Sequence, residues 1–483
     1  MLRPIRRWLP LALVALAALW LRTHDLARRP MHADEANQAV KFGTLLESGR
    51  YAFDPRDHHG PTLYYAALPI AWLRGQSTLA ALDETTVRLV PALAGTLAVL
   101  LLYALASPFG RFPALAAAAF LAVSPPAVYY SRYFIQETLL LAFTLAALVC
   151  AQRWWRGGRL AWALAAGACV GLMQATKASA PLFLFAAVLA LLAVRPRRPV
   201  SLHLARDLAL AVVAALVLAA LLYSSLGTNV SGLRDALAAY RFAFQRLAAD
   251  TGHEKPWWYY LRLFGWHREG GLLFQQLAFS ALALAGGVLA FVRREQFFRW
   301  TALYNFAIAA ALSLTPYKTP WHAIHLVPGL ALLAGLAVAA IPRRCLACAV
   351  AAIVLALQLL QTRLVAFARP ADPRNPYAYV HSSPDVLKFR ALAASALARS
   401  PDAIVRVVGE EYWPLPWYFR GLPRVGYWSV PPADCDAALV IASAAQAGAV
   451  RARLHGAYRE SYLGLRPGFA CVVFTPVAPD RVH

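Results

Sequence analysis

Charged side chains, and acidic ones above all, are scarce in this chain of 483 residues. Only 15% of its residues are charged while 60% are hydrophobic, and 24 Asp and Glu stand against 47 Lys and Arg. Soluble domains are apolar over about half of their residues, so the composition excludes an ordinary soluble enzyme and predicts a protein of the bilayer. In a soluble chain the net charge of +23 would suggest nucleic acid as a partner. Here short Arg clusters alternate with long apolar runs, which is typical of membrane topology signals and not of nucleic-acid binding.

Cysteine is scarce as well, with six residues in the whole chain. Six cysteines are too few for a disulfide scaffold at this length. Cys345 and Cys348 have no further metal ligands nearby, so we interpret them as residues of a helix and not as a zinc site. A bridge between Cys435 and Cys471 stays open, because an oxidising compartment would permit one.

Long apolar runs are what the sequence has in quantity. A hydrocarbon core of about 30 Å takes about 20 residues of helix, and about eleven runs approach or reach that length. They lie at 8–22, 86–106, 112–130, 137–152, 160–176, 179–194, 207–225, 271–292, 298–315, 322–341 and 345–362. The first follows three Arg residues, as in a signal peptide, but no small-residue cleavage site comes after it, so we expect an uncleaved helix.

The Arg residues predict which way the helices cross. Sixteen cations fall in alternate connectors, and the positive-inside rule places these connectors in the cytoplasm. They are Arg3, Arg6, Arg7, Arg111, Arg153, Arg156, Arg159, Arg195, Arg197, Arg198, Arg206, Arg293, Arg294, Arg299, Arg343 and Arg344. The N-terminus is then cytoplasmic, and the segments 23–85, 131–137, 175–179, 226–270 and 317–322 face outward from an inner or plasma membrane.

The composition changes after about residue 363. Pro, Asp and Arg return, and short β-branched runs appear at 403–408, 437–442 and 470–474, with a helical pattern at 383–400. Strands that alternate with helices predict a small α/β domain. We therefore predict a transmembrane domain at 1–362 and an extracytoplasmic α/β domain at 363–483.

Two adjacent acids in the first outer loop are candidates for the chemistry. Asp34 and Glu35 precede a segment with apolar residues on one face, which predicts a helix lying along the membrane surface. A helix start favours acids through the helix dipole, and this structural interpretation accounts for one of the two carboxylates. A carboxylate at the boundary between water and membrane suits a general base acting on a hydroxyl acceptor. His58 and His59 follow in the same loop, although histidines at a membrane surface are more often interface residues than ligands.

A second candidate is the short outer turn at 131–137, which carries Arg132 and Glu137 between two apolar runs. Ionisable groups this close to hydrocarbon cost up to about 3 kcal/mol each, so a functional reason is the default inference. The alternative is that Arg132 and Glu137 pair with each other and offset that cost.

A third candidate is the outer segment LTPYKTPWHAIHLVPG, in which Lys318, His322 and His325 lie beside two prolines. Free backbone groups and cationic side chains suit an anion such as a phosphate. The alternative is a Lys that snorkels to the interface beside a belt residue, Trp321. The aromatic segment 253–266 is either an interfacial helix or lid over the site, or an ordinary membrane anchor.

Taken together, these features resemble the GT-C membrane glycosyltransferases, and among them the protein O-mannosyltransferase-related (family 39-like) group, which depends on dolichyl-phosphate-mannose. The segments that carry the resemblance are MHADEANQAV, HHGPTLYYAALP, YYSRYFIQETLL, YKTPWH and EEYWPLPWYFRG. They are similar to a bacterial and archaeal subgroup sometimes described as flippase-associated. The resemblance covers nearly the whole chain and implies an α-helical polytopic membrane protein of about eleven transmembrane helices with a small C-terminal extracytoplasmic α/β domain.

The resemblance implies a transferase that takes a sugar from a polyprenyl-phosphate carrier and places it on an acceptor at the outer face, usually with inversion. It assigns the catalytic base to Asp34, with Glu35 as its neighbour. It assigns to Glu137 the second acid, which supports the acceptor or a cation. The acceptor, whether a protein, a lipid or a glycan, is left open, as are the sugar and the carrier length.

The same resemblance implies that Arg132, Lys318 and His322 hold the leaving phosphate, whose developing negative charge must be stabilised. Some relatives bind a divalent metal and others need none, so a metal stays open. Its available ligands would be Asp34, Glu137, His58 and His59.

Two other functions are weighed against a transferase. A flippase or transport accessory protein would move a lipid-linked sugar without making a bond, and it should carry ionisable groups at mid-depth in several helices and a repeat relating two halves. The sequence has neither, because the ionisable residues gather at the ends of the apolar runs. A binding module on a membrane anchor is the third alternative, and it leaves Asp34, Glu137 and Lys318 without a purpose.

Overall fold

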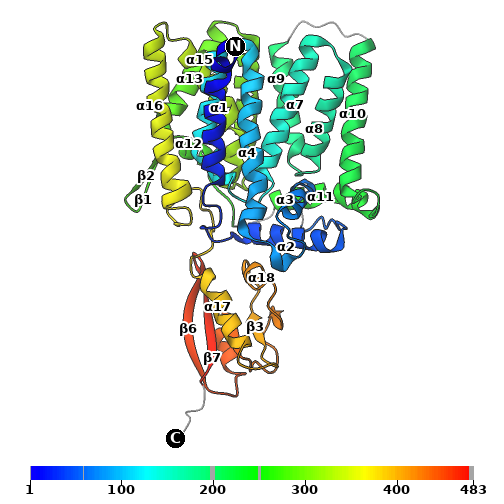
Figure 1. Ribbon diagram of the computed structural model, residues 1–483, viewed down its shortest axis with the longest axis vertical. Helices are drawn as coiled ribbons and strands as arrows, with labels where there is room; N and C mark the ends of the chain where they lie inside the picture. Colours follow the sequence, from blue (N-terminus) through cyan, green and yellow to red (C-terminus); the bar gives the residue numbers. More distant parts are fainter. Residues whose placement is uncertain (1, 58, 196–201, 249–251, 478–483) are drawn as a thin grey trace.

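The protein consists of a helical bundle with a smaller α/β tail at one of its ends (Figure 1). The computed structural model describes residues 2–57, 59–195, 202–248 and 252–477. The predictions for His58, Arg197 and Arg198 therefore fall outside the described residues. The N-terminus lies at the end of the bundle away from the tail.

Each of the eleven predicted runs coincides with a helix. They are α1 (Leu2–Thr23), α4 (Glu84–Ala106), α5 (Arg111–Val123), α7 (Glu137–Gly157), α8 (Leu160–Gln174), α9 (Ala180–Val194), α10 (Leu202–Tyr223), α13 (Leu277–Val292), α14 (Gln296–Leu314), α15 (Val327–Ala339) and α16 (Arg344–Thr362). Within the described residues, six helical stretches are long and apolar enough to cross a membrane, and the other five helices are shorter apolar ones. The predicted multi-span helical fold is confirmed. Which end faces the cell exterior stays a prediction.

Small residues let neighbouring helices approach closely. A side chain added at Gly167 in α8 would place its Cβ 2.1 Å from the carbonyl oxygen of Ala211 in α10. At Gly286 in α13 the corresponding Cβ would lie 1.8 Å from the carbonyl oxygen of Leu333 in α15. Close backbone contact at small residues is how helices pack in lipid, where water supplies no hydrophobic drive between them. Even Gly to Ala at either position would force the two helices apart.

The first outer loop contains two helices at the tail end of the bundle, α2 (Ala33–Ser48) and α3 (Thr62–Leu73) (Figure 1). α2 begins at the capping residue His32, whose ring accepts from the Asp34 N–H while the Glu35 side chain accepts from the His32 N–H, which is a capping box. It ends at Gly49, which takes the left-handed conformation at φ 68° that a helix C-terminus favours in glycine. The surface helix predicted after Asp34 and Glu35 is therefore present.

The second large outer segment differs from its prediction. It contains α11 (Ser231–Ala248), the six-residue helix α12 (Tyr259–Phe264) and a hairpin of β1 (Trp266–Glu269) and β2 (Leu272–Gln275). The run predicted as a span from 271 thus begins as a strand, and its helix α13 starts at Leu277. Gly270 and Gly271 both have positive φ, which is the signature of a tight two-residue hairpin turn.

The tail is a five-stranded mixed sheet in the order β4-β3-β5-β7-β6. Its strands are β3 (Val405–Val408), β4 (Val425–Trp428), β5 (Leu439–Ser443), β6 (Tyr458–Arg466) and β7 (Phe469–Pro476), and its helices are α17 (Val386–Leu397), α18 (Leu415–Tyr418) and α19 (Ala447–Arg451). β3 pairs in parallel with β4 and β5, while β5, β7 and β6 pair antiparallel. The three predicted strands are confirmed. Cys435 and Cys471 are both buried and form no bridge with each other.

The tail is docked on the first outer loop and on the start of α4. The indole of Trp417, which is fully buried, donates a 2.7 Å hydrogen bond to the Glu84 carboxylate. Arg420 donates to the Leu82 carbonyl, and the Tyr418 hydroxyl accepts from the Met31 N–H at 2.9 Å. The tail therefore holds the segment that leads into α2.

Candidate functional site

Glu35 is the centre of a buried ionic network at the start of α2. Its carboxylate is fully buried and accepts five hydrogen bonds. Arg88 of α4 donates two at 2.9 Å, and Arg29 donates one at 3.1 Å. The backbone N–H groups of His32 and Phe134 donate at 3.1 and 3.0 Å. One carboxylate thus joins α2, α4, the chain before α2 and the turn at 131–137.

This environment keeps Glu35 ionised. Burial alone would raise the pKa of its carboxyl, but the charges of Arg88 and Arg29, with hydrogen bonds from Arg88 and the Phe134 N–H, outweigh burial and hold that pKa well below its usual range. A carboxylate whose lone pairs are all engaged has little capacity to take a proton from a substrate.

Asp34, its neighbour in sequence, has the opposite surroundings. Its side chain is 54% exposed, and the ring of His32 lies beside it, with Nδ1 3.9 Å from Oδ2. His32 is itself fixed, because its Nε2 donates to the Tyr379 carbonyl at 3.0 Å and its Nδ1 accepts from the Asp34 N–H at 3.1 Å. The carbonyl can only accept, so the proton lies on Nε2. Asp34 is thus an open carboxylate on a rigid helix start.

Other polar residues follow Asp34 along one face of α2. Gln38, one turn further, is buried and accepts from the side chain of Gln136 at 3.0 Å. Lys41, one turn further again, pairs with Asp57 at 2.8 Å. Burial lowers the pKa of the Lys41 ammonium, and the charge and hydrogen bond of Asp57 offset part of that effect. This face links the base candidate to the turn at 131–137.

Glu137 begins α7 and is buried, where it forms an ion pair with Lys177. Lys177 lies in the outer turn between α8 and α9. The alternative that Glu137 pairs with Arg132 is therefore wrong.

Arg132 is buried and holds the end of α1. Its guanidinium donates to the carbonyls of Leu21, His24 and Asp25 at 3.2, 2.6 and 3.1 Å. It also lies over the ring of Phe367, 4.6 Å from the centroid. The unpaired carbonyls of a helix C-terminus attract cations, and here they attract Arg132. The N–H groups that bind these carbonyls are therefore not available to a phosphate.

Lys318 is likewise occupied by carbonyl groups. Its ammonium is buried and donates to the Lys255 carbonyl at 2.9 Å and to the Thr315 carbonyl. Its backbone N–H donates to the His253 carbonyl at 3.0 Å. Lys318 therefore fastens the segment 253–255 to the loop after α14. Its ammonium was expected to bind a phosphate, but in the structure it binds backbone carbonyl groups.

His322 lies in the 3-10 helix η3 (Pro320–His325) and is partly exposed. Its Nδ1 lies 3.3 Å from the Thr319 hydroxyl and 3.4 Å from the Tyr260 hydroxyl. The charges of Lys177 and His59 act on its ring. The structure thus brings Lys177, His59 and His322 into one electrostatic neighbourhood, which the sequence pattern did not predict.

Sequence reasoning did not single out Arg29, Arg88 or Lys177 as site residues. A signal for Arg88 was present, because a cation within an apolar run of a membrane protein needs a partner. Lys177 is the one charged residue of the short turn ATKAS, and nothing in the sequence indicated its partner. Its importance became visible only in the structure, where it forms an ion pair with Glu137.

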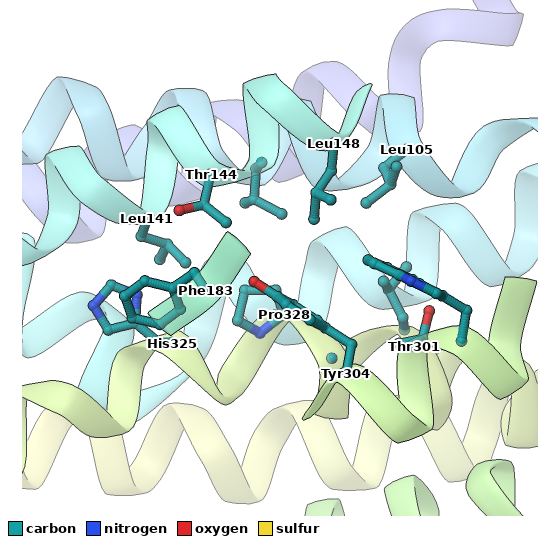
Figure 2. Close-up of a pocket in the computed structure, with 13 residues that line it drawn as sticks. Leu105, Leu141, Thr144, Leu148, Phe183, Thr301, Tyr304, His325 and Pro328 are labelled. Atoms are coloured by element: carbon teal, nitrogen blue, oxygen red, sulfur yellow. The ribbon is translucent and has the colours of Figure 1, made fainter. Parts of the chain in front are cut away.

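A small, partly open cavity lies between α7, α9, α14 and α15 (Figure 2). Its volume of about 20 Å³ suits one water molecule. Aliphatic and aromatic side chains line most of it, and Thr144, Thr301, Tyr304 and His325 supply its polar groups. A space of this size holds no sugar.

The open question of a metal can be tested on the ligand geometry. Among the described residues, the group of three candidate ligand atoms within 4.8 Å of one another is Asp434, Asp436 and His455, on the tail. Asp34, Glu137 and His59 form no such group, and Glu137 is already paired with Lys177. The described members of the candidate set, Asp34, Glu137 and His59, are therefore not arranged as a metal centre.

Comparison with known proteins agrees with this architecture. Residues 67–225, about a third of the chain, match a family model described as dolichyl-phosphate-mannose-protein mannosyltransferase. The comparison with curated proteins gives no match. Among solved structures, ArnT from Cupriavidus metallidurans in the apo state has a TM-score of 0.69 at 16% identity, over 96% of this chain and 97% of that chain. Its form bound to undecaprenyl phosphate has a TM-score of 0.67 at 17% identity, over the same shares.

Two further structures share the fold over most of this chain. The Archaeoglobus fulgidus oligosaccharyltransferase in complex with Zn and sulfate has a TM-score of 0.56 at 15% identity, over 95% of this chain and 72% of that chain. The mycobacterial arabinofuranosyltransferase AftD has a TM-score of 0.55 at 16% identity, over 99% of this chain and 40% of that chain. At these identities the likeness is one of fold. The expected fold of a multi-span helical bundle with a C-terminal mixed-sheet region, which ArnT shares, is confirmed, and membership of the GT-C enzymes and of the flippase-associated subgroup stays a prediction.

Proposed function

We propose that this protein is a membrane glycosyltransferase that moves a sugar from a polyprenyl-phosphate carrier to a hydroxyl acceptor. The fold of ArnT over the whole chain and the mannosyltransferase family match over residues 67–225 support this class of enzyme. The observation that carries the proposal is the division of the acidic pair at the start of α2. Glu35 is buried and fully bonded, while Asp34 projects as an open carboxylate from the helix that Glu35 fixes.

Asp34 acts as the general base in this proposal. An Oδ of Asp34 takes the proton from the acceptor hydroxyl as that oxygen attacks the anomeric carbon of the donor sugar. The new glycosidic bond forms while the bond from the anomeric carbon to the phosphate oxygen breaks. A single displacement from the face opposite the phosphate inverts the configuration. The polyprenyl phosphate leaves with the electron pair of the broken bond.

The leaving phosphate is stabilised by Lys177, His59 and His322. The ammonium of Lys177 has three N–H donors, and the Glu137 carboxylate holds it in place without using all three. Positive charge placed where negative charge develops is the largest common source of rate enhancement in such transfers. Glu137 then orients the Lys177 ammonium. The resemblance assigned to Glu137 the support of the acceptor or a cation, and in this proposal that cation is Lys177.

Glu35, Arg132 and Lys318 position the site without contacting the reacting atoms. Glu35 fixes the start of α2 through Arg88 and Arg29. Arg132 anchors the end of α1, and Lys318 anchors the loop before η3. The sequence suggested a direct role in catalysis or phosphate binding for each of the three. In this proposal each of them instead holds the backbone that carries the site.

The carrier and the side of the membrane follow from chemistry and charge. A long prenyl chain stays in the bilayer while its phosphate reaches the surface, where α2 lies at one end of the bundle (Figure 1). The turn at 131–137 meets α2 there, because the Phe134 N–H donates to Glu35. ArnT was solved with undecaprenyl phosphate, a carrier of this class. The Arg clusters place this end outside the cell by the positive-inside rule, so the acceptor is taken at the outer face.

The test compares Asp34→Asn with Asp54→Asn, a second exposed acid of the same outer loop. The purified protein in nanodiscs receives undecaprenyl-phosphate mannose, with native membranes as the acceptor source, and released undecaprenyl phosphate is measured. We expect release by the unsubstituted protein and by Asp54→Asn, and a loss of about 100-fold or more in Asp34→Asn, since a general base contributes about 10²–10⁴-fold. Release by Asp34→Asn at the unsubstituted rate would refute the assignment of the base. Glucosyl and arabinosyl donors extend the test, and no consumption of any of them would refute the transferase.

A further inference from the structure

Trp321 packs within the outer site, whereas the sequence offered it as a membrane-belt residue. Its indole in η3 lies 6.4 Å from the Tyr130 ring, 6.1 Å from the Tyr379 ring and 6.3 Å from the His32 ring, between centroids. These partners come from α6 (Pro125–Tyr130), from the chain that leads into the tail and from the chain before α2. A belt tryptophan would face lipid head groups, whereas this one faces protein rings on several sides.

Trp321 lies close to residues from both halves of the proposed chemistry. Its ring centroid is 6.3 Å from that of His32, whose Nδ1 is 3.9 Å from the Asp34 carboxylate. Its ring centroid is also 6.5 Å from that of His322, the next residue in the chain and a residue of the proposed phosphate site. A sugar in transfer must lie between the base that activates its acceptor and the phosphate that leaves it.

The indole N–H of Trp321 is also available to a ligand. Across the described residues no hydrogen bond is formed by its indole N–H, and the side chain is partly exposed. Its neighbours are committed, since the Tyr130 hydroxyl donates to the Tyr377 carbonyl at 2.8 Å and the Tyr379 hydroxyl bonds His253 at 2.7 Å. A partly exposed indole whose N–H is unused suits a sugar, because a pyranose offers a C–H face to a π-system and hydroxyl oxygens to a donor.

We propose that Trp321 recognises the transferred sugar, stacking on the C–H face of a pyranose and donating its N–H to one of the sugar hydroxyls. Trp321 then sets which sugar is moved, while the phosphate groups bind every carrier alike. This inference rests on the proposed function, and it adds to it a residue that determines specificity.

The experiment separates binding of the sugar from binding of the carrier. Affinities are measured in nanodiscs for undecaprenyl phosphate and for its mannosyl, glucosyl and galactosyl forms. The variants are Trp321→Ala, Trp321→Phe and the control Trp257→Ala, an exposed tryptophan of the outer segment 253–266. We expect the unsubstituted protein and the control to bind one sugar form more tightly than undecaprenyl phosphate.

Trp321→Ala should remove that preference, with a fall of about tenfold or more in the affinity ratio, while affinity for undecaprenyl phosphate itself changes less than about twofold. Trp321→Phe keeps the stacking face and should lose a smaller part. An unchanged ratio in Trp321→Ala would overturn the inference, and so would an equal loss of affinity for the sugar-free carrier, which marks a structural role. Because the readout is binding, it decides the role of Trp321 even if no transfer is observed, whereas the proposed function fails only on transfer.

Discussion

Replacing Glu35 by Gln tests whether the two adjacent acids at the start of α2 have different roles, with Glu35 stabilising the fold and Asp34 taking part in the reaction. Gln has the same shape but brings an uncharged amide, with its own N–H groups, into a site built entirely of donors. Arg88 and Arg29 are 1% and 7% exposed, so the change leaves two buried cations facing a neutral group. We expect the substitution to destabilise the fold and, through the start of α2, to slow transfer.

The expected magnitude follows from the burial of the pair. Removing one partner of a buried ion pair costs about 3–5 kcal/mol, because it leaves an uncompensated charge in the interior. The shift of Tm per kcal/mol shrinks as proteins grow, from roughly 2–4 °C in domains of 150–250 residues. For a chain of 483 residues we therefore expect Tm to fall by roughly 5 °C.

The pH dependence has a definite sign. The native environment depresses the pKa of the Glu35 carboxyl, so its stabilising contribution is complete above the unfolded value of about 4.3 and is lost only as pH falls through the lower native value. The difference in stability between Glu35→Gln and the unsubstituted protein should therefore stay constant from pH 6 to pH 8.

Thermal unfolding in nanodiscs measures the effect, with Asp34→Asn as the matched control. Asp34 is exposed, and within the part of the chain that the structure describes it forms no ion pair with Arg or Lys, so Asp34→Asn should keep the unsubstituted Tm while losing transfer. A Glu35→Gln protein with unchanged Tm would refute the reasoning on the buried network. So would a Tm loss in Asp34→Asn as large as that in Glu35→Gln.

Two further outcomes are expected. Lys177→Met should raise the donor KM by about tenfold or more, because it removes the cation of the phosphate site. Lys177→Arg keeps the positive charge and should retain most of the affinity. Steady-state kinetics would contradict the assignment if both variants behaved like the unsubstituted protein. Trp417→Phe keeps the ring but loses the hydrogen bond to Glu84, so limited proteolysis should cut the tail faster while the helical bundle keeps its Tm; equal cleavage rates would contradict the docking role.

The helices could be predicted because a bilayer leaves few choices. An apolar run must satisfy its backbone within itself, so each long run becomes a helix whatever its neighbours are. The hairpin at 266–275 was missed because its first strand has no apolar run, and its second strand reads as the start of the span that follows. Three strands of the tail, β3, β5 and β7, could be recognised from their β-branched residues, while β4 and β6 were not predicted. The order of the strands could not be predicted, since it depends on pairing between distant segments.

The site was only partly accessible from sequence, for a similar reason. Asp34 and Glu35 stand out as a pair, yet nothing local says which of them is buried. That is decided by Arg88, 53 residues away. The same holds for Arg132 and Lys318, whose charge suggested a phosphate while their partners are carbonyl groups of distant loops. Charge in a membrane protein predicts that a partner exists, and only the fold identifies it.

The contacts of the tail with the chain before α2 also determine when the site can exist. Met31 is held by the hydroxyl of Tyr418, 387 residues later, and His32 by the carbonyl of Tyr379. At synthesis rates of about 5–20 residues per second, roughly 20–80 s separate the emergence of residues 31 and 418 from the ribosome. The proposed base, Asp34, is therefore among the first residues inserted and among the last to be fixed. A nascent chain, already embedded and already close to lipid-linked sugars, would remain inactive until its last segment had been made and had docked.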